Sequence, residues 1–252
     1  VTEHIISNAK AAGVPVIVVD GQCDGCASVR FDYRTGFEAI VRHVMEEHKP
    51  RKLHFMAGSR GNLFSEERLE IFAMILKEYG IAFDRESMVS YGDFWARPTI
   101  KAAQRIIDSG DMPQAIICAN DIMAINVVAL LKKNGYRVPE DVIVTGFDGI
   151  EETHLTEPRI TTSFCDFEEL AGTVADLIQK GVWEGDYYAL PRLMVSESCG
   201  CKYNSRIDIL ESFSQLNSRF YRYQDDNHVL MQIAEDMQGC RRIEEVPAMM
   251  GH

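Results

Sequence analysis

Long apolar runs are missing from this sequence: no stretch approaches the roughly 18 residues that a membrane-spanning helix needs. Basic residues are also scarce, because 26 lysines and arginines face 38 acidic residues, for a formal net charge of −12. This balance argues against a nucleic-acid-binding surface within the chain. The first residues lack the basic-then-apolar order of a signal peptide. We therefore expect a cytoplasmic protein that makes no contact with a membrane.

Signatures of catalysis and of disulfide-rich folds are absent too. The chain contains no H-E-x-x-H pair, no G-x-S-x-G elbow and no phosphate-loop lysine, so we expect a non-catalytic protein without a cofactor. Seven scattered cysteines, an odd number, indicate reduced thiols. Two close pairs stand out, Cys23 with Cys26 and Cys199 with Cys201, and the sequence leaves their role open. We expect no metal at them, because the second pair has C-x-C spacing and the pairs fall in different predicted lobes.

What is present is a regular alternation of short β-branched runs and longer amphipathic stretches. The predicted strands cover residues 14–20, 52–58, 88–94, 114–120, 141–148 and 190–198. The predicted helices cover residues 33–47, 65–79, 98–109, 121–134 and 167–180. Strand–helix alternation with short connections is typical of an α/β fold with doubly wound parallel sheets. The length of 252 residues fits one large domain or two lobes.

Polar and aromatic side chains stand where the predicted strands end. In the stretch AIICANDIMAIN, Asn120 and Asp121 close a buried run and open a helical one, and Asp121 is expected to cap that helix. Because ligands of open parallel sheets bind beyond the carboxyl ends of the strands, these side chains are expected to share one edge. The candidate ligand-binding residues found in this way are Asp20, Arg68, Phe94, Trp95, Asn120 and Asp148. Carboxylates accept hydroxyl protons, arginine donates and rings stack on C–H faces, so the set suits a polyhydroxylated molecule. Taken singly, Asn120 and Asp148 are explained as well by turn formation.

Two long segments carry a family resemblance. Residues 113–150 (PQAIICANDIMAINVVALLKKNGYRVPEDVIVTGFDGI) and 157–178 (EPRITTSFCDFEELAGTVADLI) resemble the effector-binding domain of LacI/GalR-type transcriptional regulators. The resemblance covers about residues 5–198 and implies a periplasmic-binding-protein-like fold, with two lobes that close on a sugar-like effector. It implies effector contacts at the positions of Asp20, Arg68, Phe94, Asn120 and Asp148, and an aromatic residue near the hinge at Phe167. It also implies a homodimer.

The sequence departs from the family pattern in two places. Ile71 stands where the family commonly has a glycine after the arginine. The family domain also begins with two βα units ahead of the position of Val1, so an incomplete first lobe is expected. The expected division is a partial N-terminal lobe of residues 1–30 and 162–186, a C-terminal lobe of 31–161 and 187–201, and a helical extension of 202–252. DNA would then be bound only through a segment absent from this chain.

The extension leaves the output of the protein open. Apolar residues recur at three- and four-residue steps from Leu210 to Phe220, which predicts amphipathic helices within residues 205–240. These helices either pack on the lobe or mediate self-association, and they or a second protomer are expected to cover strand 14–20. The favoured function is effector sensing in a LacI-type regulator. The alternative is a sensor domain of a diguanylate cyclase or histidine kinase signalling protein.

Overall fold

The computed structural model describes residues 2–202 and, beyond them, only residues 217–218, 221–224, 226–227, 229 and 231. By its internal contacts the chain divides into two units, Val1–Ser205 and Arg206–His252. The predictions for residues 205–240 fall almost wholly outside the described residues. Among the residues that are described, none of the helices is both long and apolar enough to cross a membrane.

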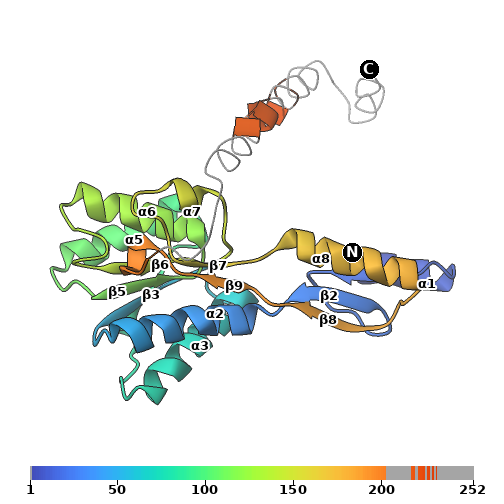
Figure 1. Cartoon of the computed structure of the whole chain (residues 1–252), viewed down its shortest axis with the longest axis horizontal. Helices are drawn as coiled ribbons and strands as arrows, with labels where there is room; N and C mark the ends of the chain where they lie inside the picture. Colours follow the sequence, from blue (N-terminus) through green and yellow to red (C-terminus); the bar gives the residue numbers. More distant parts are fainter. Residues whose placement is uncertain are drawn as a thin grey trace, which may run out of the picture. The chain divides into compact units, whose positions relative to one another are not determined.

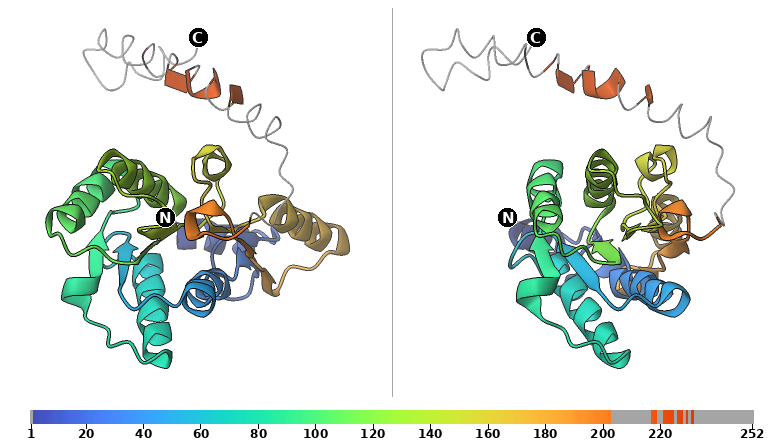
Figure 2. Two further views of the ribbon diagram at one scale, coloured as in Figure 1. Left: turned by 60° about the vertical axis from the view of Figure 1, so that its left-hand side comes forward. Right: turned by 90° about the vertical axis from the view of Figure 1, so that its left-hand side faces the viewer.

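A four-stranded parallel sheet forms the larger layer of the first unit, in the order β4-β3-β5-β6. Its strands are β3 (Leu53–Ala57), β4 (Val89–Tyr91), β5 (Ala115–Cys118) and β6 (Ile143–Thr145). Helices α2 (Tyr33–His43) and α3 (Leu63–Glu78) cover one face, and α5 (Ala96–Asp108) and α6 (Asp121–Lys133) cover the other (Figure 1). Every residue of β3 and β5 is buried, as expected for strands covered on both faces. The predicted doubly wound α/β fold is confirmed, and Figure 2 shows the strands between the two helix pairs.

A second, three-stranded parallel sheet has the order β1-β2-β8. It consists of β1 (Ile17–Val19), β2 (Ala27–Phe31) and β8 (Gly185–Ala189), with α1 (Thr2–Ala11) and α8 (Phe167–Lys180) beside it. The sequence did not predict β2 or β8, because β2 carries a serine and an arginine and β8 is largely exposed. At the sheet edge, the strand predicted over 14–20 shortens to three residues, and Val19 is 50% exposed.

The remaining elements are short. β7 (Thr162–Phe164) and β9 (Arg192–Met194) form an antiparallel ribbon. The ribbon lies against α2 at Gly36, where a Cβ would come within 2.7 Å of Pro191. The other elements are α4 (Arg85–Met88), α7 (Glu152–Leu155), a π-helical turn η1 (Val44–His48) and a 3-10 turn η2 (Glu197–Cys199). The division into two lobes, with the boundaries given above, stays a prediction.

Two helices are capped by an asparagine that the sequence analysis did not identify as a cap. Helix α3 begins at Leu63 rather than Ser65, because Asn62 Oδ1 accepts from the Ser65 amide at 3.1 Å. Helix α6 does begin at Asp121, but its capping residue is Asn120, whose Oδ1 accepts from the Met123 amide at 3.0 Å. The expectation that Asp121 caps α6 is therefore wrong.

Candidate functional site

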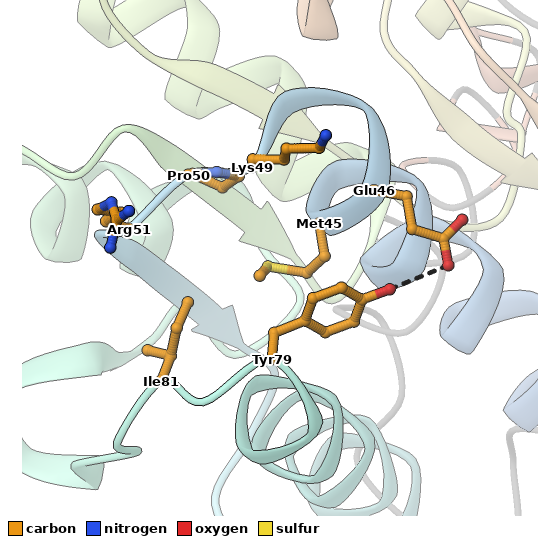
Figure 3. Close-up of a pocket in the computed structure, with 7 residues that line it drawn as sticks. All are labelled: Met45, Glu46, Lys49, Pro50, Arg51, Tyr79 and Ile81. Carbon is orange, nitrogen blue, oxygen red and sulfur yellow. Dashed lines mark hydrogen bonds between the residues drawn. The ribbon is translucent and has the colours of Figure 1, made fainter.

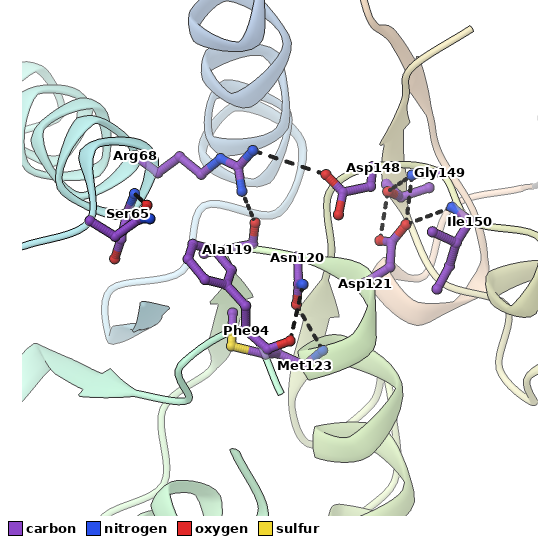
Figure 4. A network of polar contacts seen from close by, with 12 residues as sticks. Ser65, Arg68, Phe94, Ala119, Asn120, Asp121, Met123, Asp148, Gly149 and Ile150 are labelled. Atoms are coloured by element: carbon purple, nitrogen blue, oxygen red, sulfur yellow. Dashed lines mark hydrogen bonds and ion pairs between the residues drawn. The ribbon is translucent and has the colours of Figure 1, made fainter. Parts of the chain in front are cut away.

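Arg68 places a fixed positive charge beyond the carboxyl ends of β3 and β5 (Figure 4). Its Nη1 donates to the carbonyl oxygen of Ala119, and its guanidinium lies 4.2 Å from the centre of the Phe147 ring. Its Nη2 is 4.0 Å from Asp148 Oδ1. The Arg68 side chain is only 7% exposed; burial lowers its pKa and the charge of Asp148 opposes that shift. An arginine stays protonated under these conditions, so the cation is permanent.

Asp148 faces Arg68 from the end of β6 and remains 41% exposed. Its backbone has a φ of 110°, a conformation that non-glycine residues rarely adopt. Two hydrogen bonds hold it there: its amide donates to the Ser163 carbonyl at 3.1 Å, and its carbonyl accepts from Cys165 at 3.1 Å. Partial burial raises the pKa of Asp148 to about 6, and Arg68 works in the opposite direction. The residue is a partly solvated acceptor in a strained, well-anchored position.

Asp121 secures the loop that carries Asp148. Its fully buried carboxylate accepts from the Gly149 amide at 2.6 Å, the Ile150 amide at 2.9 Å and the Thr162 hydroxyl at 2.7 Å. Burial raises the pKa of Asp121, the charge of Asp148 adds to the rise, and the three donors lower it in part. The carboxylate has no free lone pair aimed at solvent, so its role is to fix the position of Asp148.

Asn120 and Phe94 lie beside this pair. While its Oδ1 caps α6, the Nδ2 of Asn120 donates to the Phe94 carbonyl at 3.3 Å. Phe94 has a φ of 64°, and its ring lies over Gly58, where a Cβ would overlap it. The structure therefore brings Asn120 to the same edge as Arg68 and Asp148, with its amide engaged by the backbone.

The sequence analysis missed three aromatic residues here: Tyr33 and Phe147, which lie next to Arg68, and Phe64, which contacts Tyr33. The Tyr33 ring lies 5.7 Å from that of Phe64 and 6.0 Å from that of Phe147, and the Arg68 guanidinium is 5.9 Å from the Tyr33 ring. Tyr33 opens α2 directly after β2, so identifying that strand would have drawn attention to it. Phe147 immediately precedes Asp148 and could have been found from that position.

Asp20 contacts Tyr33, and Phe167 is linked to Tyr33 by the ring of Phe31. Burial and then a hydrogen bond with Asp20 raise the pKa of the Tyr33 phenol. Phe167 is 64% exposed and contacts Phe31 edge-on at 5.1 Å, and Phe31 in turn lies 5.7 Å from Tyr33. Trp95 is placed differently. The residue is 67% exposed, and among the described residues its ring makes none of the aromatic contacts given above.

A hollow of about 400 Å³ lies elsewhere in the domain (Figure 3). It is lined by Met45, Glu46, Lys49, Pro50, Arg51, Tyr79 and Ile81. The Tyr79 hydroxyl donates to Glu46 Oε1 across it at 3.0 Å. Pro50 and Arg51 precede β3, so the hollow lies at the amino edge of the sheet, opposite to Arg68. Since parallel sheets bind ligands at their carboxyl edge, the Arg68–Asp148 pair is the better candidate.

The chain is similar in sequence to known proteins. The sequence profile of the periplasmic binding protein-like domain family matches residues 41–196. The HTH-type transcriptional repressor PurR of Photobacterium profundum is 26% identical over 177 residues, covering 69% of this chain and 52% of that protein. The repressor CytR of Escherichia coli is 31% identical over 136 residues, covering 54% and 39%. The chain thus spans about half the length, or less, of these relatives.

Solved structures resemble the chain as well. The transcriptional regulator CelR in complex with cellobiose superposes with a TM-score of 0.63 at 27% identity, over 75% of this chain and 60% of that one. A LacI family regulator from Arthrobacter sp. FB24 in complex with lactose gives a TM-score of 0.66 at 25% identity, over 77% and 75%. The chain belongs to the periplasmic binding protein-like domain family, as an effector-binding domain of the LacI type.

Proposed function

We propose that this domain senses a small polyhydroxylated molecule at the Arg68–Asp148 edge and passes the signal on without catalysing a reaction. The observation that carries the proposal is the 4.0 Å separation between Arg68 Nη2 and Asp148 Oδ1. This is too long for a hydrogen bond. A ligand hydroxyl fits between them, accepting from the guanidinium and donating to the carboxylate.

The surrounding groups suit a sugar or nucleoside. Tyr33, Phe64 and Phe94 offer ring faces and edges for the C–H surface or base of such a ligand. Asn120 provides an amide at the same edge, but its groups are now engaged with Met123 and Phe94. The net charge of −12 disfavours an anionic ligand. The buried Arg68 can still donate a hydrogen bond to one polar oxygen of a neutral ligand.

The relatives support a regulatory role. They are transcriptional repressors, and two solved relatives hold cellobiose and lactose. The alternative of a cyclase or kinase sensor is not favoured by these comparisons.

We propose that effector binding favours a closed arrangement of the domain, which requires the effector to bind closed and open states with different affinities. Dimerisation, a cytoplasmic location and DNA binding through another segment are part of the same proposal.

A thermal-shift screen tests this function. Cellobiose, lactose, adenosine and cytidine would be added to the wild-type chain, to Asp148→Asn and to the control Asp176→Asn, whose exposed carboxylate pairs with Lys180 on α8. A ligand present at 100 times its Kd stabilises a protein by about 2.7 kcal/mol, which is readily seen as a rise in Tm. We expect at least one compound to raise the Tm of the wild type and of Asp176→Asn, with a smaller or no rise for Asp148→Asn. An equal rise in all three proteins would place binding elsewhere.

A further inference from the structure

Four metal-ligating side chains meet at a place remote from the Arg68–Asp148 pair. They are His43, His48, Cys199 and Cys201, and their ligand atoms all lie within 4.8 Å of one another. Cys201 Sγ is 3.6 Å from His43 Nε2 and 3.4 Å from His48 Nε2, and Cys199 Sγ is 3.5 Å from His43 Nε2. His43 ends α2, His48 ends η1, Cys199 ends η2, and Cys201 follows η2 by two residues.

The measured spacing matches a tetrahedral ion. With Zn–S near 2.3 Å and Zn–N near 2.0–2.1 Å, tetrahedral angles place sulfur and nitrogen ligands about 3.6 Å apart. The three sulfur–nitrogen distances of 3.4–3.6 Å agree with that value. Hydrogen bonds between a thiol and an imidazole account for any one of these contacts. They do not account for all four side chains converging on one point.

The backbone is shaped to bring the two histidines together. In a regular α-helix, residues five positions apart point about 140° away from each other. Val44–His48 instead forms a π-helical turn, whose hydrogen bonds run between residues five apart. The His43 and His48 rings consequently lie side by side in an edge-on arrangement, with centres 5.3 Å apart and planes at 77°. Single π-turns within α-helices are frequent at functional sites.

The cysteine side of the cluster is held just as firmly. The amide of Ser198 donates to the Arg159 carbonyl at 2.9 Å, and its hydroxyl donates to the Val144 carbonyl at 2.6 Å. The buried Thr161 hydroxyl lies 3.0 Å from Cys199 Sγ and can donate to it. Such a second contact orients a ligand and supports its thiolate form. The position of Cys199 is therefore held by the fold itself.

We propose that His43, His48, Cys199 and Cys201 bind one Zn²⁺ in a closed, structural site. Two neutral imidazoles and two thiolates give the ion a neutral complex, which can be held in a half-buried place at low cost. The sequence predicted no metal, because the cysteine pairs have unsuitable spacing and fall in different predicted lobes and the histidines form no H-E-x-x-H pair. Cys23 and Cys26 lie in the loop between β1 and β2 and are not part of the cluster. His43 and His48 provide the other two ligand atoms.

Zinc at this position would join two segments that are far apart in sequence. Helix α2 begins at Tyr33, beside Arg68, and ends at His43. Cys199 and Cys201 follow His43 by 156 and 158 residues. The ion would join the C-terminal end of α2 to the segment that follows β9. The stability of the first unit would then depend on the bound ion.

Metal analysis of the full chain provides the test. The wild-type protein would be purified in the presence of Zn²⁺, desalted and assayed for zinc beside Cys201→Ser, His48→Gln and the controls Cys23→Ser and His4→Gln. We expect about one zinc per chain in the wild type and both controls, and less than about a tenth of that in the two cluster variants. Removing the zinc with a chelator should lower the Tm of the wild type by about 5–10 °C and leave the Tm of the cluster variants unchanged.

A measurement on the wild type alone guards against variants that fail to fold. Zn²⁺ should protect Cys201, which is partly exposed, from alkylation by iodoacetamide, while the partly exposed Cys23 reacts equally with and without the metal. Three results would overturn the site: no zinc retained by the reduced wild-type chain, zinc retained by Cys201→Ser and His48→Gln as fully as by the wild type, or alkylation of Cys201 at the same rate with and without Zn²⁺.

Discussion

Arg68 Nη2 and Asp148 Oδ1 lie 4.0 Å apart, with the cation buried and the carboxylate 41% exposed. The two charges neither form a direct hydrogen bond nor separate into solvent. Arg68 is fixed by the Ala119 carbonyl and the Phe147 ring, and Asp148 by a loop anchored to Asp121. The spacing is thus set by the fold before any ligand binds, and the first prediction follows from it.

Effector affinity should depend on the protonation of Asp148. Its pKa is raised to about 6 by burial, and only the ionised carboxylate accepts a hydroxyl proton without competition. Below pH 6 the Kd of the effector should rise by up to about tenfold per pH unit. Calorimetric titration from pH 5 to 8 measures this. Asp148→Asn should bind weakly with little pH dependence; a wild-type Kd that stays constant over this range would contradict the role of Asp148.

Unfolding should become easier in mild acid because of His54. This residue of β3 is buried beside Ser90, and burial lowers its pKa to about 4 from an ordinary value of 6.5. Because the folded pKa is depressed, the unfolded chain binds the proton more readily. The stability contributed by neutral His54 is therefore present above pH 6.5 and is lost toward pH 4, by up to about 3 kcal/mol.

Urea unfolding at pH 7 and pH 5 measures that loss. Changing His54 to glutamine should make the free energy of unfolding less dependent on pH, whereas changing the exposed His4 should not. If wild type and His54→Gln lose equal stability between the two pH values, another group is responsible.

A methyl group at Gly58 should disturb the site. A Cβ there overlaps the ring of Phe94, whose backbone already has a φ of 64° and so cannot easily give way. Overpacking of this kind costs about 1–3 kcal/mol. Gly58→Ala should lower the free energy of unfolding by that amount and weaken effector binding. Gly172→Ala, on α8 with open space around it, should be neutral or stabilising by up to about 1 kcal/mol. If Gly58→Ala and Gly172→Ala have the same free energy of unfolding and the same effector affinity, the Phe94 ring moves aside freely and the prediction is wrong.

Removing the Asp121 carboxylate should loosen the loop at Asp148. The alanine variant leaves the amides of Gly149 and Ile150 and the Thr162 hydroxyl short of an acceptor, which should cost about 2–4 kcal/mol of unfolding free energy. Thr162→Val removes one donor and should cost less. Hydrogen exchange of the Gly149 and Ile150 amides should accelerate in Asp121→Ala, and unchanged exchange would mean that other contacts hold the loop.

The sequence predicted the repeating strand–helix pattern well, because the buried parallel strand β5 is a continuous apolar run and β3 is interrupted only by His54. It failed for β2 and β8, whose exposed or polar residues lack that pattern. Because β2 was not predicted, Tyr33, which follows it, was not identified as a site residue. The edge shared by Arg68, Asn120 and Asp148 could be predicted, since strand ends of a parallel sheet converge.

Other features depend on contacts that a linear pattern does not contain. The capping role assigned to Asp121 belongs to Asn120, because the Asp121 carboxylate is drawn to amides 28 and 29 residues away. The cluster depends on a π-turn that brings His48 to His43, and on Cys199, which is 156 residues away from His43. Neither has a signature in the local sequence.

Isothermal titration of the compound that gives the largest thermal shift tests the central claim most directly, with wild type, Asp148→Asn and the control Asp176→Asn measured side by side. Losing one charged hydrogen-bond partner costs about 1.5–3 kcal/mol, so Asp148→Asn should raise the Kd by roughly 10- to 100-fold. Asp176→Asn should bind as the wild type does. Equal Kd values for wild type and Asp148→Asn would contradict an effector site at the Arg68–Asp148 edge.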